Sequence, residues 1–264
     1  PMPVAVILML LLGIAIGAWQ AVWIAYVHVP PFITTLSGML VFRGWSNVVL
    51  GGQTLPIKNQ SFIVLFGGGA NCYVPDILGG GEGMNRLALV VGVVACVIFV
   101  VTTMRGYLNR KKKGYETGNI AAMYIKMILI CAVILFITVK LAQYKGIPTS
   151  LVWVLIVALI YGYITSKTTI GRYFYAVGGN EKATKLSGIN TERVYFLAYT
   201  NMGLLAAVAG MLTIARLTSA QPTYGQNYEM DAIGSCFIGG ASAYGGTGTV
   251  PGVIIGATLM GIIN

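Results

Sequence analysis

The chain is divided into long uncharged apolar runs, and basic residues gather in the breaks between them. Residues 3–27 contain no charged side chain, and neither do residues 87–104 or 146–166. A helix needs about 20 apolar residues to cross the hydrocarbon core of a bilayer. Runs of this length, repeated along one chain, predict an all-α polytopic membrane helix bundle.

Four further runs bring the prediction to about seven membrane elements. They are residues 31–50, 120–141, 194–215 and 232–264. The few cations within them, such as Lys126 and Lys140, lie close enough to the ends of their run to extend into the interface. We therefore expect a single transmembrane domain over residues 1–264. The chain begins at Pro1 and ends at Asn264 within apolar runs, so we expect the natural protein to continue at both ends.

The composition excludes a soluble domain and argues against nucleic acid as a partner. Only 9% of the residues are charged and 56% are hydrophobic, whereas about a quarter of a soluble domain is charged. The net charge is +10, but binding to nucleic acid would require those cations on a soluble face. Their place between apolar runs indicates membrane topology instead, with the lipid bilayer as the solvent.

The charges of the loops predict which side of the membrane each loop faces. Residues 105–126 contain six basic residues and one acid, and residues 167–193 contain five basic residues and two acids. Cytoplasmic loops are enriched in Lys and Arg. We therefore expect cytoplasmic loops at 105–122 and 167–193, and a periplasmic loop at 44–86 between the second and third runs.

The cytoplasmic loop at 167–193 is predicted to contain a short helix. Residues 181–187 are good helix formers, Asn180 can cap the start, and Gly188 can end the helix. A short helix between two spans suits the docking of another protein, although an ordinary solvated loop would look similar. The candidate docking residues are Gly178, Gly179, Asn180, Ala183, Leu186, Ser187 and Gly188.

The last run is too rich in glycine for an even helix. We expect it to break at Gly239 and Gly240 and again at Gly245 and Gly246, as a broken or re-entrant element beside the substrate pathway. The alternative is close helix packing, because Gly248, Gly252 and Gly256 repeat every four residues.

Two smaller groups of polar residues are further candidates. Thr34, Thr35 and Ser37 place hydroxyl groups in the first turns of the second run, where they can bond a sugar or their own backbone. Glu229 and Asp231 are expected at the outer mouth, where they meet a binding protein or simply mark the membrane edge.

No enzyme motif stands out. There is no phosphate-binding G-x-x-x-x-G-K-[ST] loop, and His28 is the only histidine, so we predict neither a cofactor nor a metal site. Acids within the apolar runs, which mark proton relays, are also missing. This argues against an ion-coupled secondary transporter and implies that another polypeptide supplies the energy.

Three separated blocks resemble one family. YAVGGNEKATKLSGINTERV (residues 175–194), VPPFITTLSGMLVFRG (29–44) and YEMDAIGSCFIGGASAYGGTGTVPG (228–252) are similar to permeases of the ribose/xylose-type ABC sugar importers. Together with AWQAVWIAY (18–26), they look most like the multiple-monosaccharide and xylose permeases. The chain departs from the family pattern at Pro31, Thr34 and Ser37, and it lacks the family's earlier Ile-Asp-Leu-Ser-Val-Gly block and final helix.

The resemblance implies a multi-pass protein of the bacterial inner membrane that imports a monosaccharide such as xylose by ATP-driven alternating access. It implies a second permease copy in a homodimer, a separate ABC ATPase subunit that docks near residues 180–188, and a periplasmic sugar-binding protein. A permease of the same type for branched-chain amino acids or nucleosides stays open, because selectivity in such systems lies largely with the binding protein.

Overall fold

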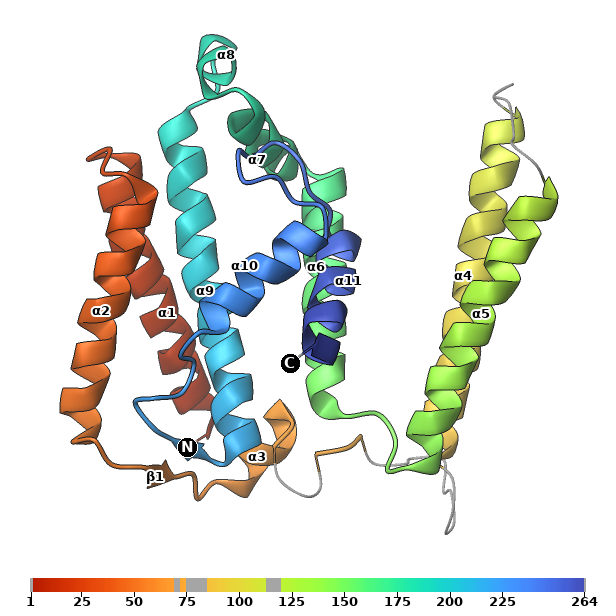
Figure 1. Cartoon of the computed structure of the whole chain (residues 1–264), viewed down its shortest axis with the longest axis horizontal. Coiled ribbons are helices and arrows are strands. Elements are labelled where there is room, and N and C mark those ends of the chain that lie inside the picture. Colours follow the sequence, from red (N-terminus) through yellow and green to blue (C-terminus); the bar gives the residue numbers. More distant parts are fainter. Residues whose placement is uncertain (1, 69–71, 75–84, 113–119, 264) are drawn as a thin grey trace. The chain divides into compact units, whose positions relative to one another are not determined.

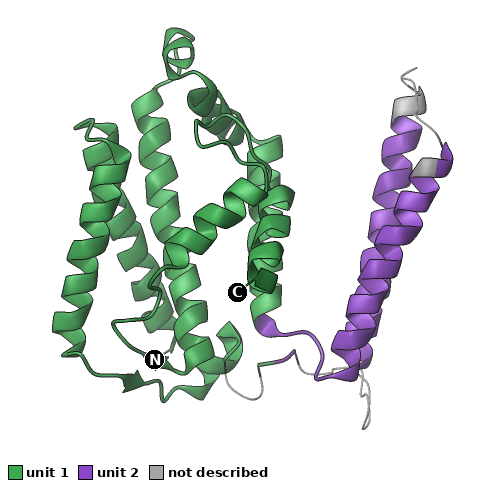
Figure 2. Ribbon diagram, viewed as in Figure 1, with its two compact units in different colours: residues 1–72, 150–264 green, residues 73–149 purple. Residues whose placement is uncertain are grey.

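The computed structural model describes residues 2–68, 72–74, 85–112 and 120–263, without the side chains of residues 110–112 and 122. It divides into two compact units, Pro1–Cys72 with Ser150–Asn264, and Tyr73–Thr149 (Figure 2). The predicted loops at 44–86 and 105–122 fall partly outside these residues. Where they are described, α2 continues to Leu50 and α4 to Lys112, so both loops are shorter than predicted.

The larger unit contains nine helices and one small sheet within the residues described (Figure 1). The helices are α1 (Met2–Ala25), α2 (Pro31–Leu50), α3 (Gln60–Phe66), α6 (Thr149–Lys167), α7 (Thr169–Gly179), α8 (Glu181–Leu186), α9 (Thr191–Leu217), α10 (Tyr228–Ile238) and α11 (Val250–Ile263). The two strands, β1 (Leu55–Pro56) and β2 (Ser219–Ala220), pair antiparallel.

Five helices of the described chain are long and apolar enough to cross a membrane: α1, α4, α5, α6 and α9. Their large side chains point outward; Leu12 is 62% exposed and Leu159 is 73% exposed. Water would not tolerate so many exposed apolar side chains, whereas lipid does. The helix α2 has the length of a span but is not among the five, because Thr34, Thr35 and Arg43 lower the hydropathy of its run.

The helices α1 and α9 form the closest pair of long helices. Gly13 and Gly17 of α1 face Gly203 and Ala207 of α9, and a β-carbon on Gly17 would lie 2.9 Å from the Gly203 Cα. Small residues four apart let two helix backbones approach within contact distance. The spacing of Gly13 and Gly17 along α1 is an example of this small-xxx-small pattern.

One end of α9 is covered by the segment that follows α2. Phe62 and Phe66 of α3 pack with Met211 and Ala215 of α9 in a buried cluster. The Phe66 ring stacks on Trp153 of α6 with centroids 5.2 Å apart, and the Trp153 indole N–H donates to the Leu65 carbonyl at 2.9 Å. Because β1 pairs with β2 just after α9, the sheet also lies at this end.

The smaller unit is an antiparallel pair of helices, α4 (Arg86–Lys112) and α5 (Ile120–Gln143). The Asn85 side chain accepts a hydrogen bond from the Ala88 N–H at 3.0 Å and thereby caps the start of α4. Gly92 lies against Thr138, and Cys96 against the Cys131 carbonyl. Small residues in the seam let the two helices pack closely along their length.

Candidate functional site

The predicted short helix is present as α8, from Glu181 to Leu186. The Asn180 side chain accepts a hydrogen bond from the Ala183 N–H at 3.0 Å, as expected of an N-cap. At the other end Gly188 has φ +83°, and the N–H groups of Gly188 and Ile189 bond the carbonyls of Lys185 and Thr184. These two bonds form a Schellman motif, so local sequence alone determines both ends of α8.

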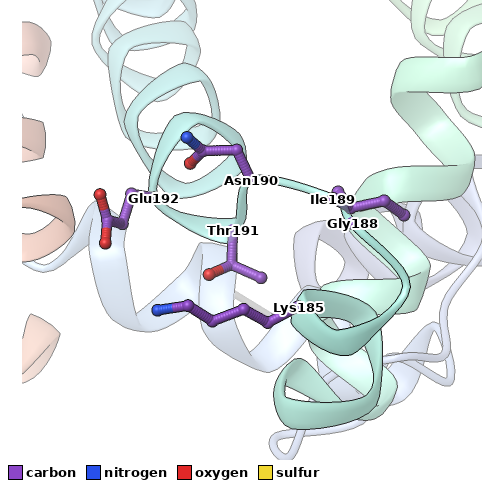
Figure 3. A pocket seen from close by; sticks show the side chains of 6 residues that line it. All are labelled: Lys185, Gly188, Ile189, Asn190, Thr191 and Glu192. Carbon is purple, nitrogen blue, oxygen red and sulfur yellow. The ribbon is translucent and has the colours of Figure 1, made fainter.

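The outer face of α8 is free of packing within its unit. Leu186 is 90% exposed, and Ala183 and Ser187 are also exposed, whereas Thr184 is buried toward α9. A pocket of about 200 Å³ lies beside this face, where α8 turns into α9 (Figure 3). Its lining joins Lys185 of α8 to Asn190 and Glu192 at the start of α9. The helix therefore presents one apolar side chain beside polar groups of both charges.

The helix α8 is attached to α9 by a side-chain hydrogen bond as well as by the chain. The Tyr195 hydroxyl on α9 donates to the Glu181 carboxylate at 3.1 Å. Both residues also line a pocket of about 190 Å³ that reaches His28 and Pro30, in the turn between α1 and α2. The first turn of α8 is thus close to α9 and to the turn that joins α1 and α2.

A second helix in this region, α7, was not predicted from the sequence. Thr168 caps its start, with its hydroxyl accepting from the Gly171 N–H at 3.2 Å. The apolar residues Ile170, Phe174 and Val177 recur at intervals of four and three, which is the signal that identifies the helix. Its last residues, Gly178 and Gly179, are therefore helical rather than part of a loop.

The glycine-rich run is split into α10 and α11 by residues 239–249. Where the two helices cross, a β-carbon on Gly239 would lie 2.5 Å from the Gly252 carbonyl oxygen, and Gly256 lies against the Ser235 carbonyl. The packing role considered for Gly252 and Gly256 is therefore what the structure shows. Gly240 instead has φ +84° with open space around it, so it serves the turn.

The turn between α10 and α11 rests on the end of α7 (Figure 1). Gly245 and Gly246 have φ of +87° and +75°; Gly245 lies against Gly178, and Gly246 lies against Gly178 and Gly179. Of the four pathway glycines, Gly239 thus meets α11, Gly245 and Gly246 meet α7, and Gly240 lies in open space. That α7 is the element they touch is not apparent from the sequence.

The three hydroxyl residues of α2 differ in their surroundings. The Thr34 hydroxyl donates to the Pro30 carbonyl at 3.4 Å, and the Thr35 hydroxyl donates to the Pro31 carbonyl at 2.9 Å. Bonding to their own backbone was the alternative to sugar binding for these residues. Ser37 lies exposed on the same helix.

Glu229 and Asp231 lie in the first turn of α10 and are half-buried. Acidic groups at a helix N-terminus interact favourably with the helix dipole. The helix dipole therefore explains why two carboxylates occur at this position, and no binding partner is needed for that explanation. It also places them where the chain enters α10, after β2 and the turn that follows it.

A groove of about 810 Å³ runs between α6, α9 and α11. Its lining is almost wholly apolar, with Val154, Leu205 and Val253 as examples. The Tyr161 hydroxyl, which also lines it, already donates to the Asn201 side chain at 2.5 Å. A sugar needs several polar partners, so we do not assign the sugar path to this groove.

Comparison with known proteins places the chain in a family. Residues 81–264 match the family described as branched-chain amino acid transport system / permease component. The chain belongs to this permease family. That membership agrees with the resemblance noted in the sequence and with the five membrane-length helices, and it makes this permease a multi-pass membrane protein.

Two curated relatives align with the permease over its whole length. The xylose transport system permease protein XylH of Haemophilus influenzae is 36% identical over 265 residues, which is 100% of this chain and 67% of that protein. XylH of Escherichia coli is 33% identical over 264 residues and 64% of its length. The permease thus spans about two thirds of the length of these relatives.

A third relative aligns over part of the permease. The ribose import permease protein RbsC of Escherichia coli is 49% identical over 120 residues, 45% of this chain and 37% of that protein. No solved structure matches the permease significantly.

Proposed function

We propose that this permease is the membrane-spanning subunit of a binding-protein-dependent ABC importer that moves a monosaccharide, xylose or a related sugar, into the cytoplasm. The observation that supports this most strongly is the 36% identity to a xylose permease over the whole chain. ATP hydrolysis takes place on a separate ATPase subunit, and a periplasmic protein delivers the sugar. Two permease copies enclose the pore in the bacterial inner membrane.

The proposed topology has about seven membrane elements. They are the five membrane-length helices, α2, and a re-entrant element formed by α10 and α11. The basic loops lie inside, so α8 faces the cytoplasm and the β1–β2 sheet faces the periplasm. The length of α9 supports placing α8 and the sheet on opposite sides of the membrane. Its 27 residues span about 40 Å, with α8 at one end and β2 at the other.

The docking site of the ATPase in this proposal is the exposed face of α8, and it leaves out Gly178 and Gly179, which end α7. Leu186 is 90% exposed, and a large apolar side chain held outward on a well-capped helix suits insertion into a partner's cleft. Closure of the ATPase pair then displaces α8, and the permease alternates between inward- and outward-facing states as a rigid-body switch.

The pathway of the sugar is proposed to run beside α10 and α11. Backbone groups at a helix break are available to a polar solute, and such breaks are tolerated at membrane depth only against protein or a water-filled cavity. Gly239, Gly240, Gly245 and Gly246 mark this break. Glu229 and Asp231 lie at the entrance on the periplasmic side.

A second candidate substrate class is a branched-chain amino acid. The description of the matching family names it, and the part of the chain that the structure describes shows no sugar-specific pocket that would exclude it. Competition between labelled xylose and unlabelled leucine for the binding protein separates the two classes.

The docking proposal is tested by ATP hydrolysis. The full-length permease is purified together with its proposed ATPase subunit and reconstituted with the binding protein. We expect sugar-loaded binding protein to stimulate hydrolysis, and Leu186→Asp to abolish both stimulation and co-purification, while Leu186→Met retains them. Full stimulation of the Leu186→Asp complex would exclude α8 as the docking site.

A further inference from the structure

At Gly178 and Gly246, the end of α7 and the turn between α10 and α11 are in direct backbone contact. A β-carbon added to Gly178 would lie 2.6 Å from the Gly246 backbone nitrogen, and one added to Gly245 would lie 2.6 Å from the Gly178 carbonyl oxygen. Distances below 3.0 Å are not tolerated without movement of one backbone. Neither Gly178 nor Gly246 has a side chain that could absorb a displacement at this contact.

A hydrogen bond joins the same two segments one turn earlier on α7. The Tyr175 hydroxyl donates to the Gly248 carbonyl oxygen at 2.7 Å. Tyr175 and Gly248 are both half-buried, so the bond is partly shielded from water. The turn is therefore held to α7 at two points, one by contact and one by a directional bond.

The helix α7 leads into α8 through a single residue. The Asn180 N–H bonds the Ala176 carbonyl at the end of α7, and the Asn180 side chain accepts from the Ala183 N–H at the start of α8. One residue thus closes one helix and opens the next. A displacement of α8 moves Asn180 and, with it, the last turn of α7.

On the other side, the turn is continuous with both helices of the proposed pathway. Gly239 ends α10 against Gly252 of α11, where their backbones are in contact. The turn also has its own internal bonds, with the Ser242 N–H donating to the Thr247 carbonyl at 3.2 Å. It therefore transmits a push to α10 and α11 rather than yielding to it.

We propose that the Gly178–Gly246 contact and the Tyr175–Gly248 hydrogen bond connect the docking helix to the pathway helices, so that movement of α8 repositions α10 and α11. The proposal rests on the proposed function and adds the coupling route to it. Gly178, Gly246 and Tyr175 are positioning residues in this account, since they act through α10 and α11 and not on the sugar.

The competing explanation is that these glycines only allow close packing and that α9 transmits the movement. Substitutions at the adjacent residues Gly178 and Gly179 distinguish these two explanations. Gly178→Ala places a methyl group 2.6 Å from the Gly246 nitrogen, whereas Gly179→Ala places one 3.9 Å from the Gly246 Cα, an ordinary contact. Both positions are helical, and alanine raises the helix propensity at each of them. A difference in transport between the two variants therefore reports the effect of the contact with Gly246.

The experiment uses the full-length permease, its ATPase and its binding protein in proteoliposomes, and measures sugar imported per ATP hydrolysed. We expect Gly178→Ala to lower this ratio by about tenfold or more, because overpacking forces the two segments apart. Gly179→Ala should stay close to the parent. Tyr175→Phe, which removes one hydrogen bond and no volume, should lower the ratio roughly fivefold.

The outcomes separate this inference from the proposed function. If the parent shows no ATP-dependent uptake, the proposed function itself fails. If the parent transports and both Gly178→Ala and Tyr175→Phe import as much sugar per ATP as Gly179→Ala, the coupling route is wrong. If Gly178→Ala does not insert into the membrane, Tyr175→Phe alone decides, and an unchanged ratio in that variant overturns the inference.

Discussion

Gly178 and Gly246 lie in backbone contact, although α8, α9 and α10 separate them along the chain. A methyl group on Gly178 would reach within 2.6 Å of the Gly246 nitrogen. The contact brings the segment that precedes the docking helix against the turn of the glycine-rich run. The two segments for which docking and transport roles are proposed therefore touch each other in the fold.

Gly188 should be required for its backbone conformation. Its φ of +83° ends α8, and proline is confined to a φ near −65°. We expect Gly188→Pro to reduce ATP-dependent uptake strongly by misplacing α8, while Gly188→Asn, which tolerates the left-handed region, keeps most of it. Uptake by vesicles that contain equal amounts of each variant measures the effect, and equal uptake by both variants would contradict it.

Ala183 should be sensitive to charge. It is exposed on α8, so aspartate at this position has room and leaves the helix folded. We expect Ala183→Asp to uncouple ATP hydrolysis from uptake because it places a carboxylate in the ATPase interface, whereas Ala183→Ser should be close to the parent. Normal uptake by Ala183→Asp would remove this residue from the docking face.

The topology predicts one-sided labelling of Lys112. After replacement of the four native cysteines, Lys112→Cys should react with an impermeant thiol reagent only when the cytoplasmic side is open. Gln53→Cys, in the exposed segment between α2 and β1, should react from the periplasmic side. Labelling of Lys112→Cys in intact cells would invert the proposed orientation.

The α1–α9 seam should tolerate little added volume. Gly17 lies in backbone contact with α9, whereas Leu12 on the same helix is 62% exposed. Gly17→Leu should destabilise the protein by about 1–3 kcal/mol or more through overpacking, while Leu12→Ile should have little effect. Thermal unfolding in detergent measures both, and a Gly17→Leu protein as stable as the parent would show that the two helices do not pack as described.

Features that depend on neighbouring residues were predictable from the sequence. The ends of α8 follow from Asn180 and Gly188, since a cap needs only a side chain or a φ value within one turn. The long spans follow from apolar run length. The helix α7 was not predicted because polar residues are interspersed with Ile170, Phe174 and Val177, so that its segment resembles a solvated loop.

Features that depend on distant packing were not predictable. Glycine in an apolar run indicates either a turn or the close approach of another segment, but it does not indicate which segment approaches. Gly240 and Gly246 each follow another glycine, yet Gly246 meets α7 and Gly240 meets open space, while Gly252 meets α10. The hydroxyl groups of Thr34 and Thr35 were likewise ambiguous until their bonds to the backbone were seen.

The central claim is that ATP on a separate subunit drives import of a sugar through this permease. The most direct measurement is uptake of labelled xylose and glucose into proteoliposomes that contain the full-length permease, its ATPase and its binding protein, with ATP supplied or withheld. We predict uptake only when both ATP and the binding protein are present. Uptake driven by an ion gradient in the absence of the ATPase would contradict the claim and indicate a secondary transporter.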